Sequence, residues 1–390
     1  MEKTFENTIL IDGYGNRVRS PAIAITEEGT IASIKEGEAA TCTNYLLPGF
    51  IDTHIHGAAG ADVMDGTAEA LKIMQQALPK EGTTGFLATT LTASPEALNK
   101  ALTEAAKAIK ESRGGAGLLG IHLEGPFINV KRAGAQPVQW VQLPDRNLFR
   151  QFQETSGKNI RIVTLAPELA GSSGLLEEIK KSGGIASAGH TDAGFAEMEE
   201  AVEAGVSQVT HMFNAMRGLH HRDIGTAGAA LLKDEIFAEL IADGIHVSPA
   251  AVSLLYKNKG AEKVLLITDA MRAKSMAEGT YTLGGNKVHV KNGQAVLEDG
   301  TLAGSVLKMN EACRNMMSWT GCSIEEIVQM SAVNPARRLG LSDRKGRLSA
   351  GMDADFTIVD EDWNVLEVYI GGKAIYRREE QHESHSDSGL

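Results

Sequence analysis

The chain has 390 residues, of which 43% are hydrophobic and 23% charged, the balance of a folded globular protein and not of a disordered or fibrous one. Because a single hydrophobic core rarely grows to this size, we expect one large domain and a smaller one. With 38 Lys and Arg against 50 Asp and Glu, the net charge of −12 argues against nucleic acid or an anionic membrane as a partner.

The three cysteines, Cys42, Cys313 and Cys322, form no CxxC pair, which argues against a disulfide scaffold and against a cysteine zinc site. This pattern fits a reducing, cytoplasmic location. The first residues lack a basic region followed by an apolar core, and no uncharged apolar run approaches the roughly 20 residues that cross a bilayer. We therefore expect neither secretion nor a membrane anchor.

Both ends of the chain alternate apolar and polar positions between glycines, a pattern typical of short strands. We predict that residues 1–48 and 346–380 together form a small β-sandwich domain. Residues 381–390 are polar, and we expect them to form a frayed tail.

Residues 49–345 repeat one pattern eight times: a short apolar run, a polar tip and a segment with helical periodicity. The runs extend from LLPGFIDTHIH to KVLLITDAM, and they predict an α/β fold, the TIM (β/α)₈ barrel. Nearly every run ends in His, Glu or Asp, and the carboxyl ends of barrel strands form the active-site face. We expect residues 279–300 to insert a hairpin between the eighth strand and its helix.

The first run ends in His54-Ile55-His56. The two-residue period of a strand places both imidazoles on one face, about 6.5 to 7 Å apart along it. This arrangement is typical of metal ligands, whereas two same-face core histidines would each need a buried partner.

Glu124 stands at the tip of an apolar strand, where a carboxylate is costly to bury unless it is paired or bound to a cation. We interpret it as a bridging metal ligand. His190 and His211 close the fifth and sixth runs, and their places at corresponding tips favour ligation of the same metal centre. His122 points to the same face as Glu124, and a place beside the ligands or in the core is favoured over a ligand role.

Asp269 ends the eighth run and is predicted to face the metal centre as general acid and base, with an N-cap or turn carboxylate as the alternative. His246 ends the seventh run. It is predicted to contact the substrate, and a structural histidine is the alternative.

The motifs PGFIDTHIHG, HLEGPF, AGHTDA, THMFNAM and LITDAM together resemble the amidohydrolase superfamily over about residues 9 to 373. The middle motifs resemble its N-acetylglucosamine-6-phosphate deacetylases. This resemblance implies a barrel with a β-sandwich, and an enzyme that hydrolyses N-acetylglucosamine 6-phosphate to glucosamine 6-phosphate and acetate. Amino-sugar catabolism and cell-wall sugar recycling would be its setting.

The resemblance also implies a cofactor of one or two divalent ions per subunit, for which Zn, Fe, Mn and Co are all candidates. Other branches of the superfamily commonly bridge their metals with a carboxylated lysine, whereas the deacetylases use the glutamate of HLEGP, here Glu124. It implies two ligand groups: Glu124, His190 and His211 for one ion, and His54, His56 and Asp269 for a second, with Glu124 able to bridge.

For the substrate, the resemblance implies that Asn214 and Ala215 contact the phosphate and that His246 contacts the sugar. Arg222 would reach the phosphate from the neighbouring subunit of a homodimer, or else be a solvated loop charge. The chain departs from the family pattern at Gln136, near which many relatives carry a histidine that polarises the acetyl carbonyl. Gln136 can still donate a hydrogen bond.

Three alternatives remain open, because a fold does not decide function. The substrate could be N-acetylgalactosamine 6-phosphate. The chain could be a ring amidase or deaminase with the same metal ligands. A non-enzymatic assembly subunit is the least favoured, since such subunits typically lose metal ligands that this chain retains.

Overall fold

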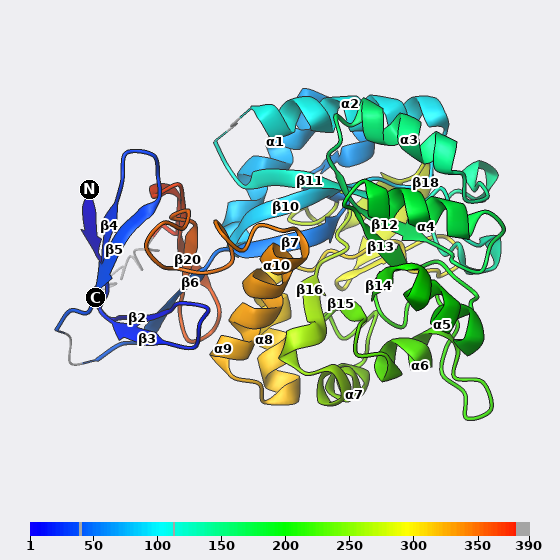
Figure 1. Ribbon diagram of the computed structural model, residues 1–390. Helices are drawn as coiled ribbons and strands as arrows, with labels where there is room; N and C mark the ends of the chain where they lie inside the picture. Colours follow the sequence, from blue (N-terminus) through cyan, green and yellow to red (C-terminus); the bar gives the residue numbers. More distant parts are fainter. Residues whose placement is uncertain (39–40, 112–113, 380–390) are drawn as a thin grey trace, which may run out of the picture.

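The computed structural model describes residues 1–38, 41–111 and 114–379. At its centre eight parallel strands follow one another in chain order (Figure 1). They are β7 (Phe50–Ile55), β10 (Thr83–Thr89), β11 (Gly117–Glu124), β12 (Ile160–Leu165), β13 (Ile185–Ala188), β14 (Val206–Val209), β15 (Phe237–Ile241) and β16 (Val264–Ile267). The predicted TIM barrel is confirmed, while the predicted tail 381–390 lies outside the described residues.

The seam between β7 and β16 closes the barrel. The Asp269 amide donates to the His54 carbonyl at 2.8 Å, and the His56 amide donates to the Ala270 carbonyl at 2.9 Å. The buried carboxylate of Asp52 accepts bonds from the amide of Thr268 at 3.3 Å and from its hydroxyl at 2.6 Å. The first and eighth strand tips therefore lie side by side.

Helices surround the barrel (Figure 1). α2 illustrates their sequence signals, because Ser94 caps its first turn, Pro95 occupies the first helical position, and Leu98 and Leu102 lie on its buried face. The α-helices are α1 (Ala68–Ala77), α2 (Pro95–Lys110), α3 (Arg146–Thr155), α4 (Ser172–Lys181), α5 (Phe195–Ala204), α6 (Gly225–Leu232), α7 (Pro249–Lys259), α8 (Met309–Thr320), α9 (Ile324–Val328) and α10 (Asn334–Arg338). Shorter turns are the 3₁₀ segments η1 (Val63–Asp65), η2 (Leu78–Glu81), η3 (Val130–Arg132), η4 (Val138–Trp140) and η5 (Ala261–Lys263), and the π-helical segment η6 (Gln329–Val333).

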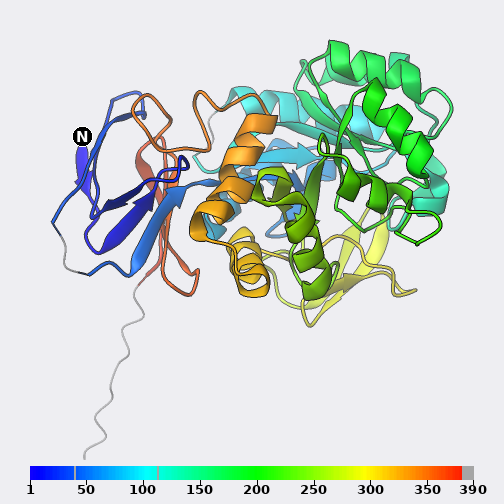
Figure 2. The same ribbon diagram turned by 60° about the horizontal axis from the view of Figure 1, so that its bottom comes forward.

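Two further sheets lie beside the barrel (Figure 2). One has the order β22-β21-β20-β6-β2-β3 and the other the order β1-β4-β5. Their strands are β1 (Glu2–Thr4), β2 (Thr8–Ile11), β3 (Arg17–Arg19), β4 (Ala22–Ile25), β5 (Ile31–Lys35), β6 (Asn44–Pro48), β20 (Phe356–Val359), β21 (Val365–Ile370) and β22 (Lys373–Arg377).

Strands from both ends of the chain share the larger of these sheets, because β20 pairs with β6. A separate apolar core contains Phe5, Ile23, Leu46, Phe356 and Tyr369, and the rings of Phe356 and Tyr369 stack at 4.6 Å. The β-sandwich built from both termini is therefore confirmed. The boundaries predicted for it and for the barrel, 1–48, 49–345 and 346–380, stay a prediction.

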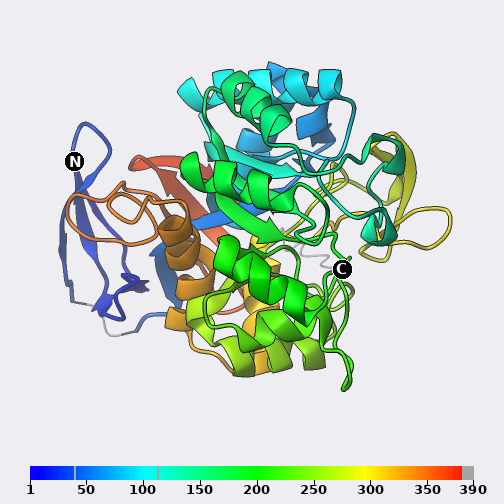
Figure 3. The same cartoon turned by 45° about the vertical axis from the view of Figure 1, so that its right-hand side comes forward.

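The insertion after β16 has three antiparallel strands, β17 (Gly279–Leu283), β18 (Asn286–Lys291) and β19 (Gln294–Val296) (yellow in Figure 3). The predicted hairpin is present as β17 and β18, and Asn292-Gly293, both at positive φ, form a second turn that adds β19. Leu283 and Val288 pack on Leu91 and Met271, so the insertion lies against the carboxyl-terminal end of the barrel. A short two-stranded ladder, β8 (Gly57–Ala58) with β9 (Ala61–Asp62), follows β7.

None of the helices in the described part of the chain combines the length and the apolar character that a membrane span requires.

Candidate active site

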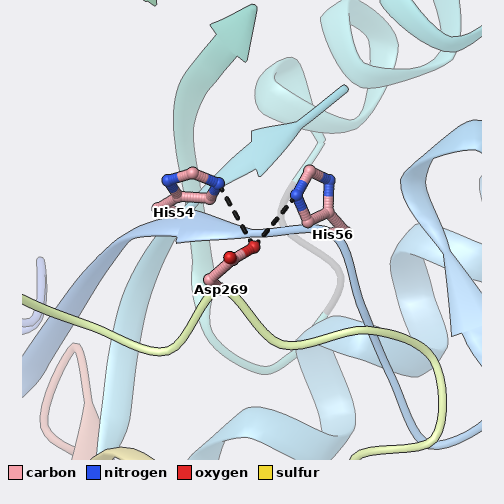
Figure 4. A group of neighbouring side chains, drawn as sticks. All are labelled: His54, His56 and Asp269. Carbon is pink, nitrogen blue, oxygen red and sulfur yellow. Dashed lines mark ion pairs between the residues drawn. The ribbon is translucent and has the colours of Figure 1, made fainter. Parts of the chain in front are cut away.

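The six predicted metal ligands converge at the carboxyl-terminal mouth of the barrel. His54 and His56 project from the end of β7 toward Asp269, which lies on the segment after β16 (Figure 4). Oδ1 of Asp269 lies 3.4 Å from Nε2 of His54 and 3.1 Å from Nε2 of His56. These three side chains, called the Asp269 group below, offer ligand atoms within 4.8 Å of one another.

A second cluster, called the Glu124 group, consists of Glu124, His190 and His211. Oε1 of Glu124 lies 3.3 Å from Nε2 of His190 and 3.2 Å from Nε2 of His211. The two imidazole Nε2 atoms are 3.1 Å apart. All three side chains are buried.

Glu124 joins the two groups, since its Oε1 also lies 3.4 Å from Nε2 of His54 and its Oε2 lies 3.3 Å from Nε2 of His56. Two ligands bound at about 2.1 Å to one tetrahedral ion lie roughly 3.4 Å apart. The spacing between the two carboxylates and the four imidazoles therefore fits the binding of a divalent cation.

The electrostatics of the cluster also favour a cation. Burial alone would lower the pKa of His54, but Asp269, Glu124 and Glu239 outweigh it and raise that pKa to about 9. Burial likewise opposes ionisation of Asp269, yet His54 and His56 hold its pKa down to about 2. These buried carboxylates thus demand positive charge close by, which protons or a divalent ion can supply.

Hydrogen bonds fix the ring orientation of three imidazoles. Nδ1 of His190 donates to the carbonyl of Arg132 at 2.8 Å, and Nδ1 of His211 donates to the carbonyl of Asn214 at 3.1 Å. Nδ1 of His54 lies 2.9 Å from Oε2 of Glu239. Each bond engages Nδ1 and leaves Nε2 facing the cluster, where the neutral ring can bind a cation. Nδ1 of His56, by contrast, has no partner among the described residues.

The backbone at three of these tips is in the left-handed region, with φ of 48° at His190, 31° at His211 and 48° at Asp269. Non-glycine residues seldom adopt it, because the Cβ crowds the neighbouring peptide groups. This unfavourable backbone conformation occurs where the chain leaves each strand, and it directs the side chain into the mouth of the barrel.

A cavity of about 400 Å³ opens over the cluster. Leu283, Thr301 and Leu302, from the inserted strands and the loop after them, line its outer side. The predicted residues Gln136, Asn214, Ala215 and His246 also line it, together with every member of the two groups except His54.

Three of the predicted substrate residues have side-chain hydrogen bonds next to the cavity. The Gln136 amide donates to Oε2 of Glu124 at 2.7 Å, and its oxygen accepts from the Thr92 amide at 2.8 Å. Asn214 turns its amide group back to the carbonyls of His211 and Met212. Nδ1 of His246 lies 2.6 Å from Oδ2 of Asp243.

Arg222 is the predicted residue that the structure does not bring to the cavity. It lies on an exposed loop, where its guanidinium is 2.8 Å from Nε2 of His221, and it is absent from the cavity lining of its own chain.

Residues 45–375 match the Amidohydrolase family. The chain belongs to the amidohydrolase family. It is 46% identical over 364 residues to the N-acetylglucosamine-6-phosphate deacetylase of Bacillus subtilis (strain 168), covering 93% of this chain and 92% of the relative. It is 35% identical over 363 residues to the N-acetylgalactosamine-6-phosphate deacetylase of Escherichia coli O157:H7, covering 93% and 95%.

Solved structures agree with this assignment to the amidohydrolase family. A mutant N-acetyl-D-glucosamine-6-phosphate deacetylase from Mycobacterium smegmatis, in complex with N-acetyl-D-glucosamine-6-phosphate, matches with a TM-score of 0.89 at 30% identity. That match covers 96% of this chain and 99% of the other. Amidohydrolases generally use a divalent metal, and the two ligand groups described above offer the donors for one.

Three carboxylates with roles around this site were not predicted from the sequence. Glu239 contacts His54 from within β15, and Asp243 contacts His246. Glu168 ends the fourth run, and it binds Thr191 and the Asp192 amide instead of the metal centre. For Glu239 a signal existed, since a carboxylate in the middle of the apolar run FAELI needs a buried partner.

His122, for which a ligand role was disfavoured, lies beside the ligands. Its Nδ1 is 3.1 Å from the Thr53 carbonyl, and its Nε2 is 2.7 Å from the Thr164 hydroxyl. Burial first, and then the neighbouring His54, lower its pKa to about 4. Both nitrogens are thus engaged away from the metal centre.

Proposed function

We propose that this chain removes the acetyl group from N-acetylglucosamine 6-phosphate, giving glucosamine 6-phosphate and acetate. The observation that carries the proposal is the position of Glu124, whose two oxygens face imidazoles of both ligand groups under a cavity lined by Asp269. The choice of substrate is supported by the similar N-acetylglucosamine-6-phosphate deacetylase of Bacillus subtilis, which is 46% identical in an alignment that covers 93% of this chain.

The residues of both groups fit divalent ions, with the Glu124 group holding one and the Asp269 group a second. When bound there, such an ion would lower the pKa of water toward about 7 and polarise the acetyl carbonyl. Zn, Fe, Mn and Co all suit imidazole and carboxylate ligands.

Asp269 serves as general base and then as general acid. Its carboxylate takes the proton of the attacking water while the new bond forms between the water oxygen and the acetyl carbon. It then gives that proton to the sugar nitrogen as the C–N bond breaks, because the nitrogen cannot leave as an amide anion. The products are acetate and the free amine.

Other residues orient the substrate. Gln136 uses one amide hydrogen on Glu124, and its second remains for the acetyl oxygen. Nδ1 of His246 faces Asp243, which leaves Nε2 for a sugar hydroxyl. Asn214 and Ala215 lie where they can contact the phosphate, and Arg222, on its exposed loop, would reach it in the neighbouring subunit of a homodimer.

We place the protein in the cytoplasm, in amino-sugar catabolism and cell-wall sugar recycling. Cys313 and Cys322 are buried free thiols and Cys42 is also unpaired, as expected where thiols stay reduced.

Acetate release tests the proposal. Purified protein loaded with Zn²⁺ should release acetate from N-acetylglucosamine 6-phosphate, and a chelator should abolish the release until metal is restored. N-acetylgalactosamine 6-phosphate, favoured as a second substrate by the similar Escherichia coli enzyme, and a cyclic amide belong in the same panel. Faster hydrolysis of the galacto epimer or of the cyclic amide would contradict the assignment.

A further inference from the structure

The carboxylate of Glu239 lies inside the barrel, beneath the metal ligands. Every residue of β15 is buried, and Glu239 has an exposed fraction of 0%. Its oxygens lie 2.9 Å from Nδ1 of His54, 2.9 Å from the amide nitrogen of Gln208 and 3.3 Å from the backbone nitrogen of His211. An anion this deeply buried is retained only where such partners compensate its lost hydration.

The direction of these hydrogen bonds follows from Arg338, which can donate but never accept. Its Nε lies 3.4 Å from Oε1 of Gln208, so that oxygen must be the acceptor. The amide nitrogen of Gln208 therefore faces Glu239, to which it donates. The order of the chain from α10 inward is thus Arg338, Gln208, Glu239.

The last bond in this chain reaches a metal ligand. A carboxylate can only accept, so Nδ1 of His54 must carry a hydrogen, and in the neutral ring that would bind a cation Nε2 carries the lone pair. That Nε2 faces Glu124 and Asp269, each at 3.4 Å, and has no other partner among the described residues. His190 and His211 are oriented by neutral backbone carbonyls, whereas His54 is oriented by an anion.

We propose that Glu239 is a positioning residue for the metal centre. It fixes the Nδ1–H form and the ring orientation of His54, and its negative charge makes Nε2 a stronger donor to a cation. This inference rests on the proposed function for its role in turnover, but it concerns metal binding and is testable without substrate.

A cation site at Glu239 itself is the competing interpretation, because His54, His122 and Glu239 offer ligand atoms within 4.8 Å of one another. Both nitrogens of His122 are already hydrogen-bonded, to the Thr53 carbonyl and the Thr164 hydroxyl. Nδ1 of His54 is bound to the carboxylate. The group is therefore satisfied internally, as expected for a support beneath the metal centre.

The test measures metal binding to the full chain, with Zn²⁺ titrated into metal-free protein against a chromophoric chelator. Glu239→Ala should weaken Zn²⁺ binding by about 10- to 100-fold. Glu239→Gln keeps an oxygen that accepts from His54 but loses the negative charge, and it should weaken Zn²⁺ binding by about three- to tenfold. Ser187→Ala is the matched control, since Ser187 is equally buried and bonds Thr210 at 2.7 Å without touching a ligand; it should stay within about twofold of wild type.

The visible spectrum of bound Co²⁺ gives a second readout, because it follows the geometry of the ligands and not the stability of the fold. It should change in Glu239→Ala and be restored in Glu239→Gln. The proposal would be overturned if Glu239→Ala had the same Zn²⁺ affinity and the same Co²⁺ spectrum as Ser187→Ala. If Glu239→Ala does not fold, Glu239→Gln decides: a loss of Zn²⁺ affinity smaller than about threefold relative to Ser187→Ala overturns the inference, and a loss of about threefold or more supports it. Inactive wild-type protein would instead refute the proposed function.

Discussion

The two halves of the ligand cluster are anchored in different ways. In the Glu124 group both imidazoles donate to backbone carbonyls, and Gln136 holds the carboxylate at 2.7 Å. In the Asp269 group His54 depends on the Glu239 side chain, and Nδ1 of His56 has no partner among the described residues. The side chain of Asp269 is also the most exposed of the six ligands, at 12%.

This difference suggests that separate residues retain the cation and carry out the proton transfer. A ligand group fixed by backbone carbonyls keeps its geometry through turnover, because peptide groups neither ionise nor rotate freely. A residue that takes up and releases a proton must face the cavity, and it must be able to exchange its hydrogen-bond partners during the reaction. We therefore expect Glu124 and the four imidazoles to control metal retention, and Asp269 to control the chemical step.

The largest effect should come from the residue shared by both groups. Glu124→Gln removes the charge that faces four imidazoles, so we expect loss of bound metal and a fall in turnover of at least about a thousandfold. Metal analysis and acetate release would measure both. A variant that kept full metal content and activity would contradict the role of Glu124 as the bridge.

Asp269→Asn should separate the two functions. We expect metal content to stay nearly unchanged while turnover falls by about a hundredfold or more, since the amide cannot carry the proton. Metal analysis beside kcat gives the answer. Near-normal turnover would remove Asp269 from proton transfer, and complete metal loss would mean that the two groups do not differ.

A change outside both groups should leave the metal centre intact. Arg222→Ala should raise KM for the phosphorylated sugar by about tenfold, because a charge-assisted hydrogen bond to the phosphate is lost, and leave KM for N-acetylglucosamine unchanged. Arg150→Ala is a suitable control, since Arg150 is an exposed arginine paired with Glu178 on the outside of the barrel. Equal effects on both sugars would place Arg222 away from the phosphate.

The smallest expected effect is a pH dependence of stability in metal-free protein. The pKa of His54 is raised from 6.5 to about 9, so its protonated form stabilises the fold below pH 6.5 and this contribution is lost as the pH rises through 9. The Tm of metal-free protein should therefore fall by a few degrees over this range. Bound Zn²⁺ would take the place of the proton and should abolish this fall in Tm. If scanning calorimetry gave the same dependence of Tm on pH with and without Zn²⁺, the link between His54 protonation and stability would be refuted.

Much of the site followed from strand periodicity and barrel topology. The two-residue period put His54 and His56 on one face, and the carboxyl ends of parallel barrel strands must meet at one mouth, which brought Glu124, His190 and His211 to the same place. Family resemblance added the candidate contacts to the sugar phosphate. Arg222 is the exception, because it lies on an exposed loop away from the cavity of its own chain, and strand periodicity does not place loop residues.

The sequence by itself determined the barrel, the β-sandwich from both termini and the convergence of six His, Glu and Asp side chains, because these depend on local periodicity and on which residue ends each strand. Only the tertiary structure decided what supports them. Glu239 and His54 are separated by 185 positions. The third strand of the insertion packs against residues from other loops at the end of the barrel. Such contacts depend on the distances between elements after folding, which no local pattern records.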